Sequence, residues 1–222
     1  MWSMNDTIYN YRPHGQSRRI SMKEKESSID AKKKILNIAL EEFAHNGYQA
    51  TSTNVICKKA EVSKGLLYHY YGSKENMYLA VARHVIYNFK ENIKIHIQDS
   101  NKKGIDYISE YFNSKFEFFG ENPLYSKIIV NLVLNNTIED ARKIANEFED
   151  YNNTLLYEVI KSIDFNPKFD REKAFELILM IGSKLEEKHM KDIECKDKDI
   201  VIEEFRRDHK IMLEMVFEGI DK

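Results

Sequence analysis

Glycine and proline are scarce in this chain, which leaves long stretches free to form regular helices. Its 222 residues include eight glycines and three prolines, and the stretches between them place apolar residues at helical spacing. One example is the run Leu36, Ala39, Leu40 and Phe43, which falls on one face of a helix that Gly47 should end. No sustained period-two alternation, the pattern typical of strands, occurs. The sequence therefore predicts an all-α fold.

Caps and breakers divide the chain into predicted helices and indicate its domain organisation. Serine and threonine precede several apolar runs, and glycine, asparagine or proline follows them, as expected at helix ends. We expect residues 1–26 to be a flexible leader or an arm that reaches into a DNA minor groove. Residues 27–73 should form a small helical domain and residues 74–222 a larger one. The predicted helices cover 27–46, 51–60, 63–72, 73–97, 104–119, 123–135, 139–163, 171–191 and 199–218.

Composition excludes several classes of protein. No apolar run approaches the roughly 18 residues that span a bilayer, so we expect no membrane partner and a cytoplasmic location. The two cysteines, Cys57 and Cys195, lie far apart, which suits a reducing compartment. Residues 1–90 hold 14 lysines and arginines against 8 acidic residues, whereas residues 91–222 hold 20 against 28. A basic head on an acidic body is typical of a protein that binds a polyanion at one end.

The segment 51–76 carries the chemistry that points to the polyanion. It is predicted to form two short helices around a tight turn, and such short helices must dock on neighbours to be stable. Ser63 can cap the second helix, which presents Lys64, Tyr68 and His69. Two helices joined in this way, with the second in the major groove, form the helix-turn-helix of DNA-binding proteins. Double-stranded DNA is therefore the expected partner.

An ordered set of small, aromatic and polar residues extends without a gap over about residues 30–80. Its members are Phe43, Gly47, Tyr48, Thr51, Ser52, Ile56, Ala60, Val62, Ser63, Lys64, Gly65, Leu67, Tyr68, Tyr70, Tyr71, Ser73, Lys74 and Glu75. This set resembles the N-terminal domain of the TetR/AcrR family of transcriptional regulators. The resemblance implies an N-terminal three-helix DNA-binding domain and a larger helical domain for effector binding and dimerisation. The remainder of the chain shares only the helical layout.

Roles within the predicted interface follow from position. The first residues of a recognition helix meet base edges, while polar residues around it contact phosphates and set the register. Lys64 can donate to a guanine or to a phosphate, and its spacing does not separate the two. The predicted DNA-binding residues are Thr51, Ser52, Thr53, Ser63, Lys64, Gly65, Leu66, Tyr68, His69, Tyr70 and Lys74.

One head makes few phosphate contacts, so we expect a homodimer that places two heads on a quasi-palindromic operator. The resemblance implies the same, through a four-helix bundle. The last two predicted helices carry broad apolar stripes, and a glycine within the first costs roughly 1 kcal/mol relative to alanine, which close helix packing would explain. Alternatively, the stripes face the chain's own core. The predicted dimer interface is Phe175, Ile178, Gly182, Leu185, Phe205, Met212 and Val216.

The middle helices are rich in aromatic residues. The resemblance implies that this region encloses an effector pocket, and aromatic rings suit a hydrophobic or aromatic small molecule. Most of these rings are expected to be core, and ligand contacts are predicted for Tyr107, Tyr111, Phe148 and Tyr151. The predicted function is that of a repressor released by an effector, and no cofactor is expected.

Two other classes of protein compete with this interpretation. An enzyme is not predicted, because no nucleophile elbow, glycine-rich phosphate loop or metalloprotease motif occurs. His189, Cys195 and His209 lack a specific metal-ligand spacing, so they are expected to be solvated and no metal site is predicted. An architectural or adaptor protein would use the same head without an effector. A short protected palindrome in a footprint would indicate a regulator, and diffuse protection an architectural protein.

Overall fold

The computed structural model describes residues 22–98, 102–134, 137–163, 170–193 and 195–220 of the chain. Within this part of the chain every regular element is helical, which confirms the predicted all-α fold. The elements are α1 (Met22–Ala50), α2 (Thr53–Ala60), α3 (Lys64–Tyr71), α4 (Lys74–Ile93), the π-helical turn η1 (Lys94–Gln98), α5 (Gly104–Glu121), α6 (Pro123–Leu134), α7 (Glu139–Ser162), α8 (Arg171–Ile193) and α9 (Lys198–Ile220).

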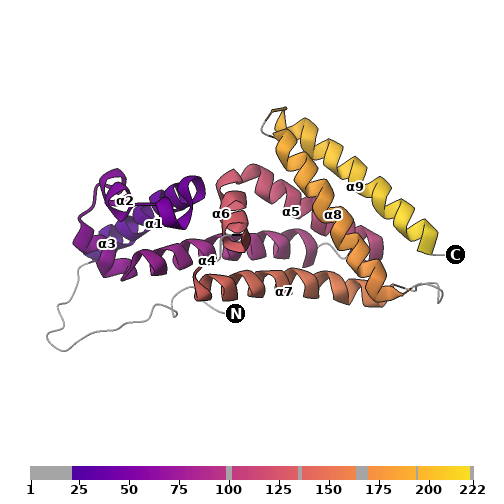
Figure 1. The fold of residues 1–222 in the computed structure, drawn as a ribbon, viewed down its shortest axis with the longest axis horizontal. Coiled ribbons are helices and arrows are strands. Elements are labelled where there is room, and N and C mark those ends of the chain that lie inside the picture. Colours follow the sequence, from indigo (N-terminus) through magenta and orange to yellow (C-terminus); the bar gives the residue numbers. More distant parts are fainter. Residues whose placement is uncertain (1–21, 99–101, 135–136, 164–169, 194, 221–222) are drawn as a thin grey trace.

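The molecule is elongated, with a small head at one end (Figure 1). Helices α1 to α3 form this head, and helices α4 to α9 form the body. Helix α4 runs from the head into the body, and α6 contacts both α1 and α4. The antiparallel pair α8 and α9 lies at the far end from the head. The head is thus joined to the body through α4 and α6.

Helix α1 begins earlier than predicted and is kinked at Gly47. It starts at Met22, inside the predicted leader, and the rest of that leader, residues 1–21, lies outside the described residues. Gly47 has a φ of 69° and a ψ of 176°, a conformation that residues with a side chain rarely adopt. Regular helical geometry is therefore interrupted where this glycine predicted a helix end.

A small core fixes the three helices of the head relative to one another. Ile35, Ala39 and Phe43 of α1 are fully buried together with Ile56 of α2 and Leu67 of α3. Helices as short as α2 and α3 depend on such contacts for their stability. The helical spacing seen in the sequence thus corresponds to the inner face of the head.

Aromatic rings fill much of the core of the body. The Phe89 ring of α4 lies 5.6 Å from Phe118, 5.4 Å from Phe119 and 5.1 Å from Phe148, measured between ring centroids. Pairs at these separations stabilise a core beyond the area they bury. These rings act as packing residues, as expected for most aromatics of the middle helices.

The apolar stripes of α8 and α9 partly face the protein's own core. Ile178 and Phe205 are completely buried, and Gly182 and Met212 are buried as well. A Cβ atom at Gly182 would lie 2.3 Å from a ring carbon of Phe112, so only glycine lets α8 approach α5 this closely. The prediction that these four residues form a dimer interface is corrected, because packing within the chain already covers them.

Candidate nucleic-acid interface

Helices α2 and α3 are joined by a tight, fixed turn. Glu61 ends α2 in the left-handed conformation, with φ 55° and ψ 42°. The Val62 N–H then donates to the Cys57 carbonyl at 3.0 Å. Ser63 begins α3, and its hydroxyl accepts a hydrogen bond of 3.1 Å from the Leu66 N–H, as predicted for an N-cap. This is the geometry of a helix-turn-helix.

Helix α3 has an inner and an outer face. Leu67 is completely buried and Tyr71 is 7% exposed, so both anchor the inner face. On the outer face Lys64 and His69 are exposed, and Tyr68 is 37% exposed. The outer face therefore offers a cation, a phenol and an imidazole to a DNA groove.

Tyr71 fastens α3 to α1. Its hydroxyl donates to the Lys32 carbonyl at 2.9 Å. Burial, with a smaller contribution from Tyr70, raises the pKa of Tyr71 to about 12. The phenol therefore stays protonated and remains a donor, which keeps the recognition helix at a fixed distance from α1.

Two of the predicted phosphate contacts make bonds within the head. The Tyr70 hydroxyl lies 2.8 Å from the Ser28 hydroxyl. The Lys74 ammonium donates to the Gln49 carbonyl at 3.2 Å and lies 4.6 Å from the centroid of the Tyr48 ring. Desolvation lowers the pKa of Lys74. Both side chains thus hold the head together at the edge of the expected interface.

Thr51 is turned into the head, and its predicted phosphate contact is corrected. It is 4% exposed, and its hydroxyl donates toward two backbone carbonyls, Gly47 at 2.7 Å and Glu42 at 3.0 Å. Those bonds tie the chain down just after the kink of α1, so the hydroxyl is not available to DNA. The other predicted contacts reach the surface: Ser52, Ser63 and Gly65 are exposed, while Thr53 and Leu66 are half-buried.

Lys58 is an exposed cation at the end of α2 that was not predicted to contact DNA. The adjacent Lys59 instead forms an ion pair of 2.6 Å with Glu42 of α1. The two lysines are equivalent in the sequence. Only the docking of α2 on α1 shows that one of them meets a carboxylate.

A cavity of about 490 Å³ lies among α5, α6, α7 and α8. Phe148 lines it, whereas the other three predicted ligand residues are outside its lining. Tyr111 is buried and its hydroxyl donates to the Asn152 side-chain oxygen at 2.9 Å. Tyr107 and Tyr151 are half-buried, and the Tyr151 ring lies 4.4 Å from the ammonium of a lysine of α4. The four residues therefore do not converge on this cavity.

The expectation that His189, Cys195 and His209 are solvated is wrong for the two histidines. Cys195 is exposed, but His189 is 1% exposed and His209 is completely buried. The His209 ring lies 4.7 Å from that of Phe112. Packing of α5 against α8 and α9 encloses both imidazoles.

This fold and this outer face of α3 define a helix-turn-helix DNA-binding protein with a larger helical body. Residues 35–81 match the family described as bacterial regulatory proteins, tetR family. The chain belongs to the TetR family of transcriptional regulators. Among the described residues, no helix is long and apolar enough to cross a membrane.

Relatives of known function are transcriptional regulators. The chain is 47% identical over 53 residues to the HTH-type transcriptional regulator QacR of Staphylococcus aureus, a match that covers 24% of this chain and 28% of QacR. It is 28% identical over 152 residues to IcaR of the same species, a negative transcriptional regulator of the biofilm operon icaADBC, which covers 67% of this chain and 78% of IcaR.

Solved structures share the fold over most of the chain. A bacterial regulatory protein of the tetR family from Rhodococcus RHA1 superposes with a TM-score of 0.65 at 20% identity, covering 82% of this chain and 96% of that one. The transcriptional regulator FadR from Bacillus subtilis, solved in complex with stearoyl-CoA, gives a TM-score of 0.63 at 17% identity over 79% and 95% of the two chains.

Proposed function

We propose that the protein is a homodimeric repressor that binds a quasi-palindromic operator and is released by a small hydrophobic effector. The observation that carries this proposal is the outer face of α3, where Lys64, Tyr68 and His69 face solvent on a helix anchored by Leu67 and Tyr71. A fixed helix with these side chains exposed fits a major groove. Because its partner is chromosomal DNA, we expect it to act in the cytoplasm.

The dimer contact is proposed for the outer face of α8 and α9. Leu177 and Met180 of α8 are 43% and 71% exposed, and Ile211 and Met215 of α9 are 48% and 73% exposed. These four side chains are named here the outer apolar face. A cavity of about 720 Å³ runs between the two helices beneath it. So much exposed apolar surface is typical of a protein–protein contact.

Three residues of the originally predicted interface can still take part. Phe175, Leu185 and Val216 are only partly buried, and Leu185 and Val216 line the cavity beneath the outer apolar face. Two copies of α8 and α9 packed face to face would form a four-helix bundle. A twofold axis through that bundle would place the two heads on equivalent half-sites.

The effector is proposed to occupy the cavity among α5, α6, α7 and α8. Its apolar lining includes Phe116, Phe119, Ile129 and Phe148, which suits a hydrophobic or aromatic molecule. That FadR was solved with stearoyl-CoA shows that one protein of this fold holds a long apolar ligand. Helix α6 lines the cavity and also contacts α1, so a ligand that displaces α6 would move the head.

Binding of selected genomic DNA fragments tests the DNA-binding assignment. We expect Lys64→Ala and Tyr68→Ala each to weaken operator affinity about tenfold or more, since a base contact is worth roughly 1–3 kcal/mol. Both side chains are exposed, so the melting temperature should change little. The control Lys143→Ala removes an exposed cation of α7, far from the head. Unchanged affinity in both head variants at physiological salt would refute the assignment.

Footprinting separates a regulator from an architectural protein. A short palindromic protected region upstream of a gene supports the proposed repressor, because two heads related by a twofold axis read two half-sites. Protection spread evenly along the DNA would instead support the architectural alternative.

A further inference from the structure

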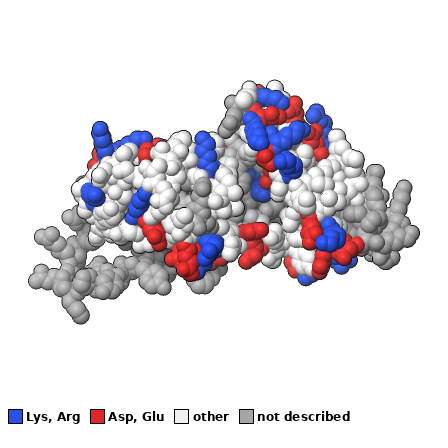
Figure 2. All heavy atoms as spheres, in the orientation of Figure 1, with Lys and Arg blue, Asp and Glu red and all other residues white. Residues whose placement is uncertain are grey.

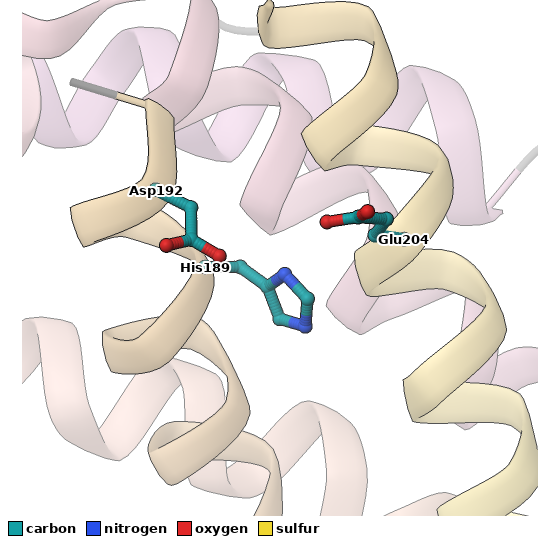
Figure 3. A group of neighbouring side chains, drawn as sticks. All are labelled: His189, Asp192 and Glu204. Carbon is teal, nitrogen blue, oxygen red and sulfur yellow. The ribbon is translucent and has the colours of Figure 1, made fainter. Parts of the chain in front are cut away.

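The turn between α8 and α9 brings a histidine and two carboxylates together. His189 and Asp192 lie near the end of α8 and Glu204 lies on α9, and one potential ligand atom from each lies within 4.8 Å of the others. Figure 3 shows the imidazole directed into the space between the two carboxylates. Charged side chains crowd this end of the molecule (Figure 2). These three residues are called here the hairpin cluster.

The imidazole of His189 is held in one orientation. The ring is 1% exposed and meets the rings of Phe116 and Phe205 nearly edge-on, at centroid distances of 6.2 and 5.7 Å. Its Nε2 atom lies 3.1 Å from a carboxylate oxygen of Asp208. An ionised carboxylate only accepts hydrogen bonds, so Nε2 carries the hydrogen, and in the neutral ring Nδ1 keeps a free lone pair.

That lone pair is buried and has no hydrogen-bond partner among the described residues. Buried polar atoms are nearly always satisfied, so an unpartnered nitrogen directed at two carboxylates needs an explanation. A cation between Nδ1 and the carboxylates would satisfy all three groups at once. The carboxyl end of α8, with its partial negative charge, also favours a cation there.

We propose that His189, Asp192 and Glu204 bind a divalent first-row transition metal ion, of which Zn²⁺ is the natural probe. One imidazole nitrogen and two carboxylate oxygens are ligands that Zn²⁺ accepts, with water completing the shell. Asp208 takes the position of an outer-shell carboxylate, which orients a ligating histidine and fixes its tautomer. The bound ion links α8 to α9 beside their connecting turn.

Small movements of the two carboxylates close the site. Metal–ligand bonds of about 2.1 Å place two ligand atoms at most about 4.2 Å apart, so the widest pair must approach by roughly 0.6 Å. The Asp192 and Glu204 side chains are 32% and 33% exposed and so have room to rotate. The buried His189 remains in place.

Lys196 is the competitor for the two carboxylates. Its ammonium lies 3.1 Å from Asp192 and 3.5 Å from Glu204. The lysine side chain is 48% exposed, so it can move into solvent as the metal enters. The site therefore exchanges one positive charge for two, and its affinity for metal includes the cost of displacing Lys196.

Thermal unfolding and titration of the full chain, without an affinity tag, test the proposal with Zn²⁺. We expect Zn²⁺ to raise the melting temperature of the unmodified protein and Glu204→Gln to weaken the Zn²⁺ affinity at least about tenfold. Glu204 is partly exposed, so this variant keeps the test valid even if changes at the buried His189 prevent folding. The control Glu214→Gln makes the same change at a 52% exposed site on the same helix. Equal Zn²⁺ affinity in the two variants would overturn the proposal.

Two further measurements exclude the remaining occupants. Lys196→Ala removes the competing ammonium and should tighten Zn²⁺ binding several-fold; if Lys196 is the permanent partner instead, Zn²⁺ leaves the melting temperature of the unmodified protein unchanged and the proposal fails. Co²⁺ bound by the hairpin cluster should show ligand-field bands without a thiolate charge-transfer band. A thiolate band would assign the ion to the exposed Cys195 and would also overturn the proposal.

Discussion

His209 illustrates how the fold changes the chemistry of a single side chain. Its ring is completely buried and lies 4.7 Å from the ring of Phe112 and 5.6 Å from that of Phe205. Desolvation lowers its pKa from the ordinary 6.5 to about 4, because the charged imidazolium is disfavoured in this apolar site. The folded protein therefore keeps His209 neutral at pH values where the unfolded chain protonates it.

This shift predicts a loss of stability in mild acid. Between pH 6.5 and pH 4 the unfolded chain binds the extra proton, so stability falls as the pH is lowered through this window. We expect His209 to account for about 2 to 3 kcal/mol of the free energy of unfolding across it, by the usual linkage relation. His209→Phe should flatten this dependence in denaturant titrations at a series of pH values.

The exposed His45 provides the control for that experiment. The same replacement there should leave the pH dependence between pH 6.5 and pH 4 as it is in the unmodified protein. If the His209→Phe protein loses stability as steeply as the unmodified one, groups other than this imidazole cause the loss. The carboxylates do not imitate the effect of Glu187, for example, whose lysine partners lower its pKa to about 2, below this window.

At the scale of helices, local signals predicted the boundaries well. The predicted helices 171–191 and 199–218 correspond to α8 and α9, which span Arg171–Ile193 and Lys198–Ile220. Caps, glycines and prolines act on neighbouring residues, so their effects can be recognised without knowing the fold. The head could be predicted in more detail because its resemblance covers nearly every position.

The direction that each helix face takes could not be predicted in the same way. Both stripes of α8 and α9 are broad, and only the close approach of α8 to α5 at Gly182 shows which one is internal. Thr51 and His189 are similar cases, because their burial depends on segments distant in the sequence. Periodicity identifies an apolar face, but it does not say whether that face meets the same chain or a second copy.

The outer apolar face predicts the effect of a charge on dimer formation. Met180→Asp should leave the monomer folded, because this side chain is 71% exposed. In a twofold dimer each substitution occurs twice, and burying an unpaired carboxylate opposes association strongly, so we expect the dimer to weaken about a hundredfold or more. Sedimentation velocity at micromolar concentration measures this, and operator affinity should fall with it.

A matched substitution on another helix is the control for the dimer experiment. Leu134→Asp introduces the same charge at a residue of α6 that is 72% exposed. It should leave the sedimentation coefficient unchanged. An unmodified protein that sediments as a monomer, or a Met180→Asp protein that remains a dimer, would contradict the proposed interface.

At the scale of the whole molecule, α6 connects the cavity to the DNA-binding head. Pro123, Ser126 and Ile129 line the cavity from this helix. On its head side, the Asn131 amide donates to the Phe43 carbonyl of α1 at 3.3 Å. The same helix thus contacts the proposed effector and the helix on which the recognition helix is anchored. A ligand changes DNA affinity only if it favours one position of this helix over another.

Filling the cavity from α6 should therefore imitate the effector. Ser126→Trp adds a large apolar side chain to the lining, and it should shift α6 against α1 and lower operator affinity about tenfold, which is a typical allosteric coupling. Val133→Trp, on the same helix at a 57% exposed position, should leave affinity unchanged. Both variants are measured for DNA binding and for melting temperature. A Ser126→Trp protein that is stably folded and binds the operator as tightly as the unmodified protein would show that α6 does not transmit the signal, and the effector would then have to act through α4 instead.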